Sequence, residues 1–123
     1  MAKLLIVDDE TDVREFAASF FRKRKVEVST ASSGEEAINL MDKQKPHLVL
    51  MDIKMSGIDG IETLRRIREK DKDVKVIMVT GREPDDAEAF NKCREYGAID
   101  YIHKPLDLHE LEKVVLSVLE KIK

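Results

Sequence analysis

The stretch LLIVDDE, from Leu4 to Glu10, joins a short apolar run directly to three consecutive acids. An uninterrupted apolar run of this length is typical of a strand that is covered on both faces of a sheet. Carboxylates at the end of such a strand repel one another and lose hydration, so a positive charge has to compensate them. The stretch therefore predicts a buried strand with a charged site at its carboxyl end.

Short apolar runs and helix-patterned segments alternate along the chain five times. Alternating polarity in Val26-Glu-Val28 indicates a strand nearer a sheet edge than the others. Strictly alternating β and α elements with short connections predict a parallel sheet with right-handed crossovers and helices on both faces. We therefore expect one domain over residues 1–123, a three-layer α/β sandwich. The runs predicted as strands are Leu4–Val7, Val26–Ser29, His47–Met51, Val74–Val79 and Ala98–Ile102.

The segments between these runs carry helical periodicity and helix-start signals. Pro84 suits the first turn of a fourth helix, where its missing N–H would lack a partner anyway. The first segment has one apolar stripe, at Val13, Phe16, Ala17, Phe20 and Phe21. Four motifs have the shape of a capping box, namely Asp12-x-x-Glu15, Ser33-x-x-Glu36, Asp59-x-x-Glu62 and Asp107-x-x-Glu110.

Composition excludes several classes of protein. With 123 residues, 42% of them apolar, the chain can build one core without disulfides or metal clips. The lone Cys93 predicts a buried, inert thiol and a reducing, cytoplasmic setting. No signal peptide precedes the first run, and no apolar segment approaches the roughly 18 residues of a membrane span. The formal net charge of −3 argues against direct nucleic-acid binding.

Chemically active residues follow the predicted strands, at the edge where ligands bind in open parallel sheets. Three aspartates, Asp8, Asp9 and Asp52, gather there with one ammonium, and one ammonium cannot balance three carboxylates. Hard oxygen ligands of this kind suit Mg²⁺, so we expect a divalent metal beside Lys104. Helix capping by Asp8 or Asp9 is the alternative, but it leaves the shared edge with Asp52 and Lys104 unexplained. The residues at this edge are Asp8, Asp9, Glu10, Asp52, Thr80, Gly81, Lys104 and Pro105.

A metal, a carboxylate, a hydroxyl and an ammonium together suit phosphoryl transfer. A carboxylate such as Asp52 can accept a phosphoryl group as an aspartyl phosphate. Mg²⁺, Lys104 and the Thr80 hydroxyl would bind the transferred oxygens, which carry the charge of the transition state. Gly81 has no side chain to obstruct the approach of the phosphoryl group.

Four motifs, VDDE, MDIKMSGIDG, VTG and HKP, occur in an order and spacing that together are highly specific. On these motifs the chain resembles the receiver domains of bacterial response regulators, and over its whole length it is similar to the single-domain chemotaxis type. The resemblance implies a flavodoxin-like (βα)5 fold, doubly wound, with a five-stranded parallel sheet in the order 2-1-3-4-5. It also implies a cis bond before Pro105.

The resemblance also implies a role for each residue at the acidic edge. Asp52 would take a phosphoryl group from a histidine of a sensor kinase or phosphotransfer protein. Asp9 and Asp52 would coordinate Mg²⁺ directly, Asp8 largely through water, and the Lys54 backbone carbonyl would add an oxygen. Lys104 would pair with the acyl phosphate.

Two further residues would convert phosphorylation into a change of surface. The resemblance implies that Thr80 moves to bond the phosphoryl group and that Tyr101 swings inward behind it, reshaping the face of the fourth helix, fifth strand and fifth helix for a downstream partner. A local electrostatic change would thus bias a two-state element. We expect a regulator and not an enzyme, with only self-phosphorylation and self-dephosphorylation chemistry, acting as a monomer or a phosphorylation-dependent dimer.

The chain departs from the family pattern beside the acceptor. Ser56 stands where relatives commonly have proline, which predicts a slightly looser loop. Lys54 and Arg82 lie two residues after Asp52 and Thr80, at family positions that tune phosphate lifetime. Neither side chain can act as a base or accept a hydrogen bond from water at neutral pH, which predicts slow self-dephosphorylation.

Three other readings stay open at this point. A flavodoxin-like electron carrier would need a loop rich in Ser, Thr or Gly after the first strand to cradle a flavin phosphate, whereas DDET repels phosphate. A phosphatase of the haloacid dehalogenase type needs a second acid where Lys54 stands. A receiver-like interaction module that works without phosphorylation is the third, although the set of Asp8, Asp9, Asp52, Thr80 and Lys104 is intact.

Overall fold

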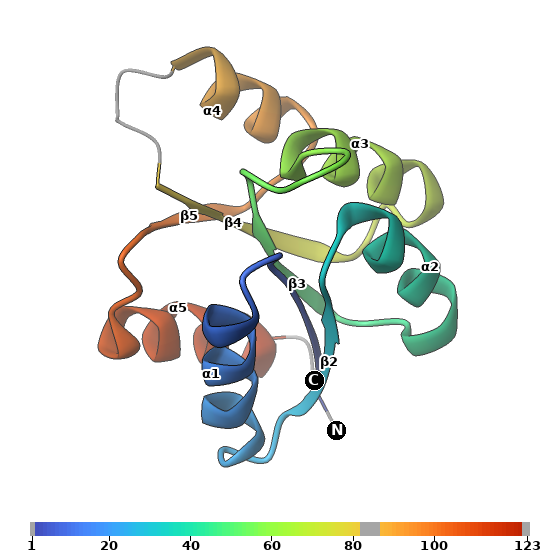
Figure 1. The fold of residues 1–123 in the computed structure, drawn as a ribbon. Coiled ribbons are helices and arrows are strands. Elements are labelled where there is room, and N and C mark those ends of the chain that lie inside the picture. The colour runs from blue at the N-terminus through green and yellow to red at the C-terminus, as the bar shows by residue number, and fades with distance from the viewer. Residues whose placement is uncertain (1, 82–86, 122–123) are drawn as a thin grey trace.

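The computed structural model describes residues 2–81 and 87–121, which form five strands and five helices in strict alternation (Figure 1). The strands are β1 Lys3–Val7, β2 Glu27–Ala31, β3 Leu48–Asp52, β4 Lys75–Thr80 and β5 Asp100–His103. The helices are α1 Thr11–Arg22, α2 Gly34–Gln44, α3 Gly60–Lys70, α4 Ala87–Glu95 and α5 Leu108–Lys121. In these described ranges, no helix is long and apolar enough to cross a membrane.

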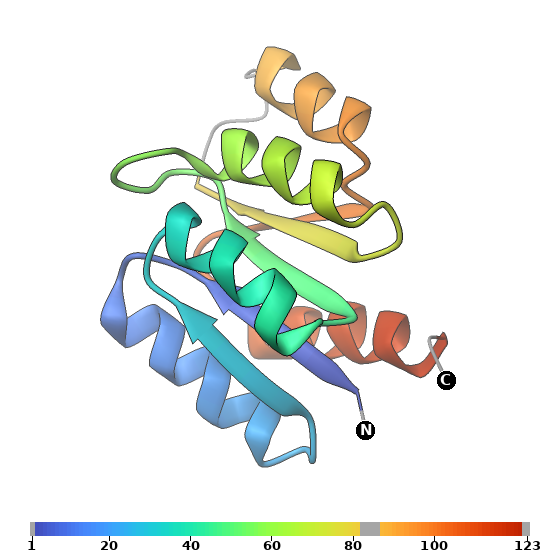
Figure 2. The same ribbon diagram turned by 90° about the vertical axis from the view of Figure 1, so that its right-hand side faces the viewer.

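All five strands are parallel and pair in the order β2-β1-β3-β4-β5. Helices α1 and α5 cover one face of this sheet, and α2, α3 and α4 cover the other (Figures 1 and 2). The flavodoxin-like doubly wound fold and its strand order are therefore confirmed. Strand β2 lies on one side of β1, and β3 lies on the other. Because the strand order changes direction between β1 and β3, a ligand cleft is expected at the carboxyl ends of these two strands.

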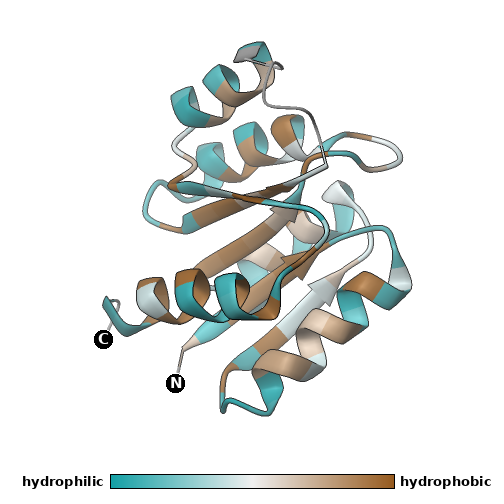
Figure 3. Ribbon diagram, turned by 90° about the vertical axis from the view of Figure 1, so that its left-hand side faces the viewer, coloured by the Kyte–Doolittle hydropathy of each residue, from teal (hydrophilic) through white to brown (hydrophobic). Residues whose placement is uncertain are grey.

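The sheet separates two hydrophobic clusters, because successive side chains of a strand point to opposite faces. Leu5 and Val7 of β1 lie in the cluster beneath α2, α3 and α4, whereas Leu4 and Ile6 lie in the one beneath α1 and α5. Figure 3 shows hydrophobic residues along most of the strands of the sheet. Strand β3 is buried throughout, whereas β2, at the edge, is mostly half-exposed, as its alternating pattern predicts.

Several predicted strand boundaries were wrong by one or two residues, and local hydrogen bonds at the ends of the preceding helices explain two of them. Val26 is buried, but its N–H donates to the Phe21 carbonyl and ends the α1 turn, so β2 begins one residue later. The N–H of Ala98 likewise donates to the carbonyl of Cys93 on α4. Cys93 itself is fully buried, as predicted. The apolar stripe of α1 was wrong at Phe16, whose side chain is 54% exposed.

Helix starts follow the predicted caps in part. The Ser33 side chain accepts a hydrogen bond from the Glu36 N–H at 3.1 Å, and Asp59 accepts from the Glu62 N–H at 2.9 Å. The box at Asp12 was wrong, because α1 begins at Thr11 and Asp12 lies inside its first turn. The Asp107 carboxylate accepts from the His109 N–H instead of the predicted third residue, and Pro84 lies outside the described residues.

One arginine joins three segments at the amino-terminal edge of the sheet. The Arg68 guanidinium, at the end of α3, donates to four backbone carbonyls. These are the carbonyls of Val74 at 2.8 Å, Tyr96 at 3.0 Å, Asp71 at 3.3 Å and Gly97 at 3.3 Å. Because a planar guanidinium presents five donors in a fixed fork, it can hold the α3–β4 and α4–β5 loops together.

We expect Arg68→Lys to lower the free energy of unfolding by about 1–3 kcal/mol, because one ammonium cannot reach all four carbonyls. Urea unfolding at pH 7 measures the change. Arg66→Lys is the matched control. Arg66 pairs with Glu62 on the exposed face of the same helix, and its substitution should cost about 0.5 kcal/mol or less. Equal losses in the two variants would contradict the bridging role of Arg68.

Candidate functional site

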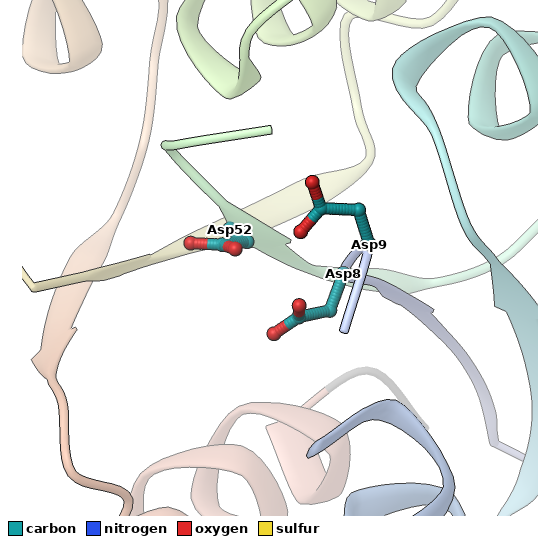
Figure 4. A group of neighbouring side chains, drawn as sticks. All are labelled: Asp8, Asp9 and Asp52. Atoms are coloured by element: carbon teal, nitrogen blue, oxygen red, sulfur yellow. The ribbon is translucent and has the colours of Figure 1, made fainter. Parts of the chain in front are cut away.

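Three carboxylates meet at the carboxyl ends of β1 and β3 (Figure 4). Val7 pairs with Met51 across these neighbouring strands, so Asp8 and Asp52 follow paired positions and end side by side. One carboxylate oxygen from each of Asp8, Asp9 and Asp52 lies within 4.8 Å of the others. The side chains of Asp8 and Asp52 are buried, whereas Asp9 is more accessible to solvent.

Asp8 is fixed by its own backbone and by the turn into α1. Its N–H donates to the Ala31 carbonyl of β2 at 3.1 Å, and its own carbonyl accepts from the Arg14 guanidinium at 2.8 Å. The Asp8 carboxylate accepts from the Glu10 N–H at 2.9 Å, which closes the turn before the helix. Glu10 is the N-cap of α1, but its side chain makes no capping bond. Capping by an acid side chain therefore does not explain this acidic stretch.

The β3–α3 loop, residues 53–59, fixes the end of β3 at Asp52. The Ile53 N–H donates to the Val79 carbonyl at 3.0 Å, and the Gly60 N–H donates to the Ile53 carbonyl at 2.7 Å. A Cβ on Gly60 would lie 2.1 Å from the Asp52 carbonyl oxygen, so only glycine allows the loop to return this closely to the strand. Sequence reasoning did not identify this role of Gly60.

Lys104 brings positive charge to the acids from the end of β5. Its N–H donates to the Thr80 carbonyl at 2.8 Å, and its peptide bond to Pro105 is cis. The ammonium nitrogen lies 3.2 Å from an Asp52 oxygen and 3.6 Å from oxygens of both Asp8 and Glu10. One side chain therefore pairs with three carboxylates at once.

The family model described as the response regulator receiver domain matches residues 4–116 of the chain. The chain belongs to this family. The flavodoxin-like carrier and the dehalogenase-type phosphatase are therefore set aside.

The receiver domain is 33% identical over 117 residues to sporulation initiation phosphotransferase F of Bacillus subtilis, covering 95% of this chain and 93% of that protein. It spans only 25% of Escherichia coli regulatory protein AtoC, to which it is 37% identical. For several other curated relatives, described as transcriptional regulators, it spans about half of their length.

Solved structures agree with this assignment. A CheY-like receiver domain protein from Methanospirillum hungatei matches with a TM-score of 0.92 and 27% identity, over 98% of this chain and 95% of that one. Response regulator TrrA from Thermotoga maritima matches with a TM-score of 0.83 and 32% identity, over 97% of this chain and all of that one. The structure of TrrA is a complex with Mg²⁺ and BeF.

Burial and a neighbouring like charge shift the pKa of Asp52, the predicted phosphoryl acceptor. Burial, followed by repulsion from Asp8, raises the pKa of Asp52 to about 6, although Lys104 and a backbone hydrogen bond from Lys54 oppose the shift. Burial alone would lower the pKa of the Lys104 ammonium, but the carboxylates of Asp52 and Asp8 outweigh it and raise that pKa. The receiver domain therefore holds more negative charge at this edge than Lys104 can neutralise.

This excess of charge fits a hard divalent cation. Three carboxylates at mutual ligand distance, two of them buried, are the oxygen donors that Mg²⁺ accepts while keeping several waters. Asp8, Asp9 and Asp52 are thus the residues that could hold such an ion.

The structure describes four of the other predicted residues, namely Thr80, Gly81, Tyr101 and Lys54. Thr80 ends β4 and is fully buried, next to Gly81, where an added Cβ would meet no described atom within 4 Å. The Tyr101 hydroxyl donates to the Phe90 carbonyl of α4 at 2.9 Å, and the two rings are 5.2 Å apart. Lys54 is exposed beside Asp52, and Arg82 lies outside the described residues. The roles of these residues stay predictions.

The raised pKa of Asp52 predicts that, without divalent cations, the domain loses stability as pH rises. Below about pH 4 the group is protonated in both states. Between about pH 4 and 6 the folded state binds more protons than the unfolded one. A cost of about 3 kcal/mol therefore develops and persists above pH 6. Asp52→Asn should escape this cost, so its advantage over wild type should grow from pH 4 to pH 7.

Urea unfolding in metal-free buffer at pH 4, 5 and 7 measures this difference. Asp12→Asn is the matched control, since Asp12 is exposed on α1, and it should change stability by no more than about 0.5 kcal/mol at each pH. A difference between Asp52→Asn and wild type that does not vary with pH would contradict the prediction.

Proposed function

We propose that this receiver domain is a phosphorylation-dependent switch of a two-component system, in which Asp52 accepts a phosphoryl group from a phosphohistidine. The donor would be a sensor histidine kinase or a phosphotransfer protein. The observation that carries this proposal is the buried Asp52 carboxylate, with the Lys104 ammonium 3.2 Å away and two further carboxylates within ligand distance. The match to the receiver family supports it.

Mg²⁺ is the cofactor that the acids fit. Asp8, Asp9 and Asp52 would hold it, with the Lys54 backbone carbonyl as a further oxygen. When bound, the ion neutralises charge on the phosphoryl oxygens during transfer. The Mg²⁺–BeF complex of the relative from Thermotoga maritima supports this assignment.

The transfer itself uses groups of this chain. A carboxylate oxygen of Asp52 forms the new O–P bond while the N–P bond of the phosphohistidine breaks, and its electron pair returns to the imidazole nitrogen. Lys104, which is already within reach of Asp52, exchanges a carboxylate oxygen for a phosphoryl oxygen. Hydrolysis of the acyl phosphate by water then restores Asp52. The domain is therefore a regulator that undergoes its own modification and not an enzyme with an external product.

Phosphorylation would reach the surface through Thr80 and Tyr101. Thr80 is buried at the carboxyl end of β4, and its carbonyl accepts a hydrogen bond from the Lys104 N–H. Tyr101 contacts α4 through its hydroxyl and its ring. Movement of both side chains would therefore change the face formed by α4, β5 and α5, where a downstream partner would bind. We propose that the domain does so in the cytoplasm, as a monomer or a phosphorylation-dependent dimer.

Incubation with a small acyl-phosphate donor and Mg²⁺ should add one phosphoryl group, measured as intact mass. Asp52→Asn should gain none, and a chelator should abolish the gain. Lys104→Met should react about 100-fold more slowly, because it lacks the charge that stabilises the transferred oxygens. Lys113→Met, which removes an exposed lysine on α5, should react like the wild type.

If the folded wild type gains no mass, a phosphorylated histidine kinase or phosphotransfer protein replaces the small donor. Failure with both donors would contradict the proposed function. It would then favour the alternative of a receiver-like interaction module that works without phosphorylation.

Loss of the phosphoryl group should be slow, with a half-life of minutes or longer. Neither Lys54 nor Arg82 can accept a hydrogen bond from an attacking water. Lys54→Gln, which introduces an acceptor, should shorten the half-life severalfold, followed as decay of the phosphorylated mass after donor removal. Lys72→Gln, on an exposed loop at the opposite edge, is the control. A wild-type half-life of only seconds would contradict this prediction.

A further inference from the structure

Ser56 donates two hydrogen bonds to the Asp9 carboxylate of the acidic site. Its backbone N–H donates to Asp9 Oδ2 at 3.1 Å, and its hydroxyl donates to the same oxygen at 3.3 Å. These bonds join the β3–α3 loop to the end of β1, across 47 positions of the sequence. Since a carboxylate can accept at about four lone-pair positions, two donors on Oδ2 orient the group and leave Oδ1 available to a ligand.

The position of Ser56 is set by β3 itself. The loop leaves the strand at Ile53 and returns to it at Gly60, whose N–H donates to the Ile53 carbonyl at 2.7 Å. Gly57, next to Ser56, has a φ of +75°, which favours glycine and turns the chain back. The loop thereby fixes Ser56 relative to Asp52. The hydrogen bonds from Ser56 in turn fix the Asp9 carboxylate relative to Asp52.

Asp9 is held differently from its two neighbours. The Lys104 ammonium pairs with the carboxylates of Asp8 and Asp52, and Asp8 also accepts from the Glu10 N–H. Asp9, in contrast, takes its two donors from Ser56. Both donors are neutral, so they orient the Asp9 carboxylate without cancelling its charge.

We propose that Ser56 is a positioning residue that orients Asp9 for a divalent cation. The inference rests on the proposed Mg²⁺ site and deepens it. An oriented carboxylate loses less conformational freedom when it becomes a ligand, and loss of such an outer hydrogen-bond partner typically weakens metal binding about 10- to 100-fold. Ser56 acts through Asp9 and needs no contact with the ion.

Three substitutions separate the two donors. Ser56→Thr keeps the N–H and the hydroxyl, Ser56→Ala keeps only the N–H, and Ser56→Pro keeps neither. The affinity for Mn²⁺, used as the probe and read from the electron paramagnetic resonance signal of the free ion, should fall in that order. We expect a change of less than about twofold for threonine, severalfold for alanine and about 10-fold or more for proline. Mg²⁺ should displace Mn²⁺ in every variant that binds it.

Two controls distinguish positioning from a general loss of structure. Ser117→Ala, which removes an exposed hydroxyl on α5, should bind Mn²⁺ like the wild type. In an Asp9→Ala background, Ser56→Ala should change the affinity less than twofold further, because its target is gone. In chelator, the thermal midpoints of Ser56→Thr, Ser56→Ala and Ser117→Ala should match that of the wild type. If Ser56→Pro fails to fold, the comparison of threonine with alanine decides.

The outcomes are distinct. Equal Mn²⁺ affinity in wild type and Ser56→Ala, or tighter binding by Ser56→Ala, would overturn the inference while leaving the proposed metal site intact. Tighter binding would show that Ser56 competes with the ion for Asp9. A wild type that binds no Mn²⁺ would overturn both the inference and the metal site on which it rests.

Discussion

The shortage of positive charge at the carboxyl edge of the sheet is the constraint on which the rest of the site depends. Lys104 pairs with the carboxylates of Asp8, Glu10 and Asp52, and Asp9 adds further negative charge beside them. Burial keeps water from screening these charges, which is why the pKa of Asp52 rises in spite of the nearby ammonium. A cation that binds at Asp8 or Asp52 would therefore meet a carboxylate already paired with Lys104. Asp9, in contrast, has no such pairing within the described part of the chain.

The parallel fold creates this shortage. Paired strands end together, so the residues that follow β1 and β3 are brought side by side whatever their mutual repulsion. The backbone then holds them there, through the bond of Asp8 to β2 and the close return of Gly60 to Asp52. Hydrophobic burial of β3 supplies the free energy that keeps the repelling carboxylates together. Hydrophobic packing and charge repulsion are thus opposed at the same few residues.

The sequence was sufficient to predict the order of elements, the parallel sheet and the gathering of Asp8, Asp9, Asp52 and Lys104 at one edge. Those features follow from periodicity and from the rule that parallel strands end together. Predictions for single helix positions were less successful. Phe16 fits the apolar stripe of α1 but is exposed, whereas the buried side of α1 is formed by Ala17, Ala18 and Phe21. The Asp12 box failed because the turn at Asp8 starts the helix earlier.

Contacts between distant loops could not be predicted from local pattern. The bonds from Ser56 to Asp9 and from Arg68 to the α4–β5 loop join segments far apart in sequence. They lie at opposite edges of the sheet, and each fixes a loop. At the acidic edge, this means that replacing the family's common proline by serine adds two donors to a carboxylate. Proline would restrict the loop backbone but donate no hydrogen bond, whereas Ser56 joins the loop to Asp9 through two.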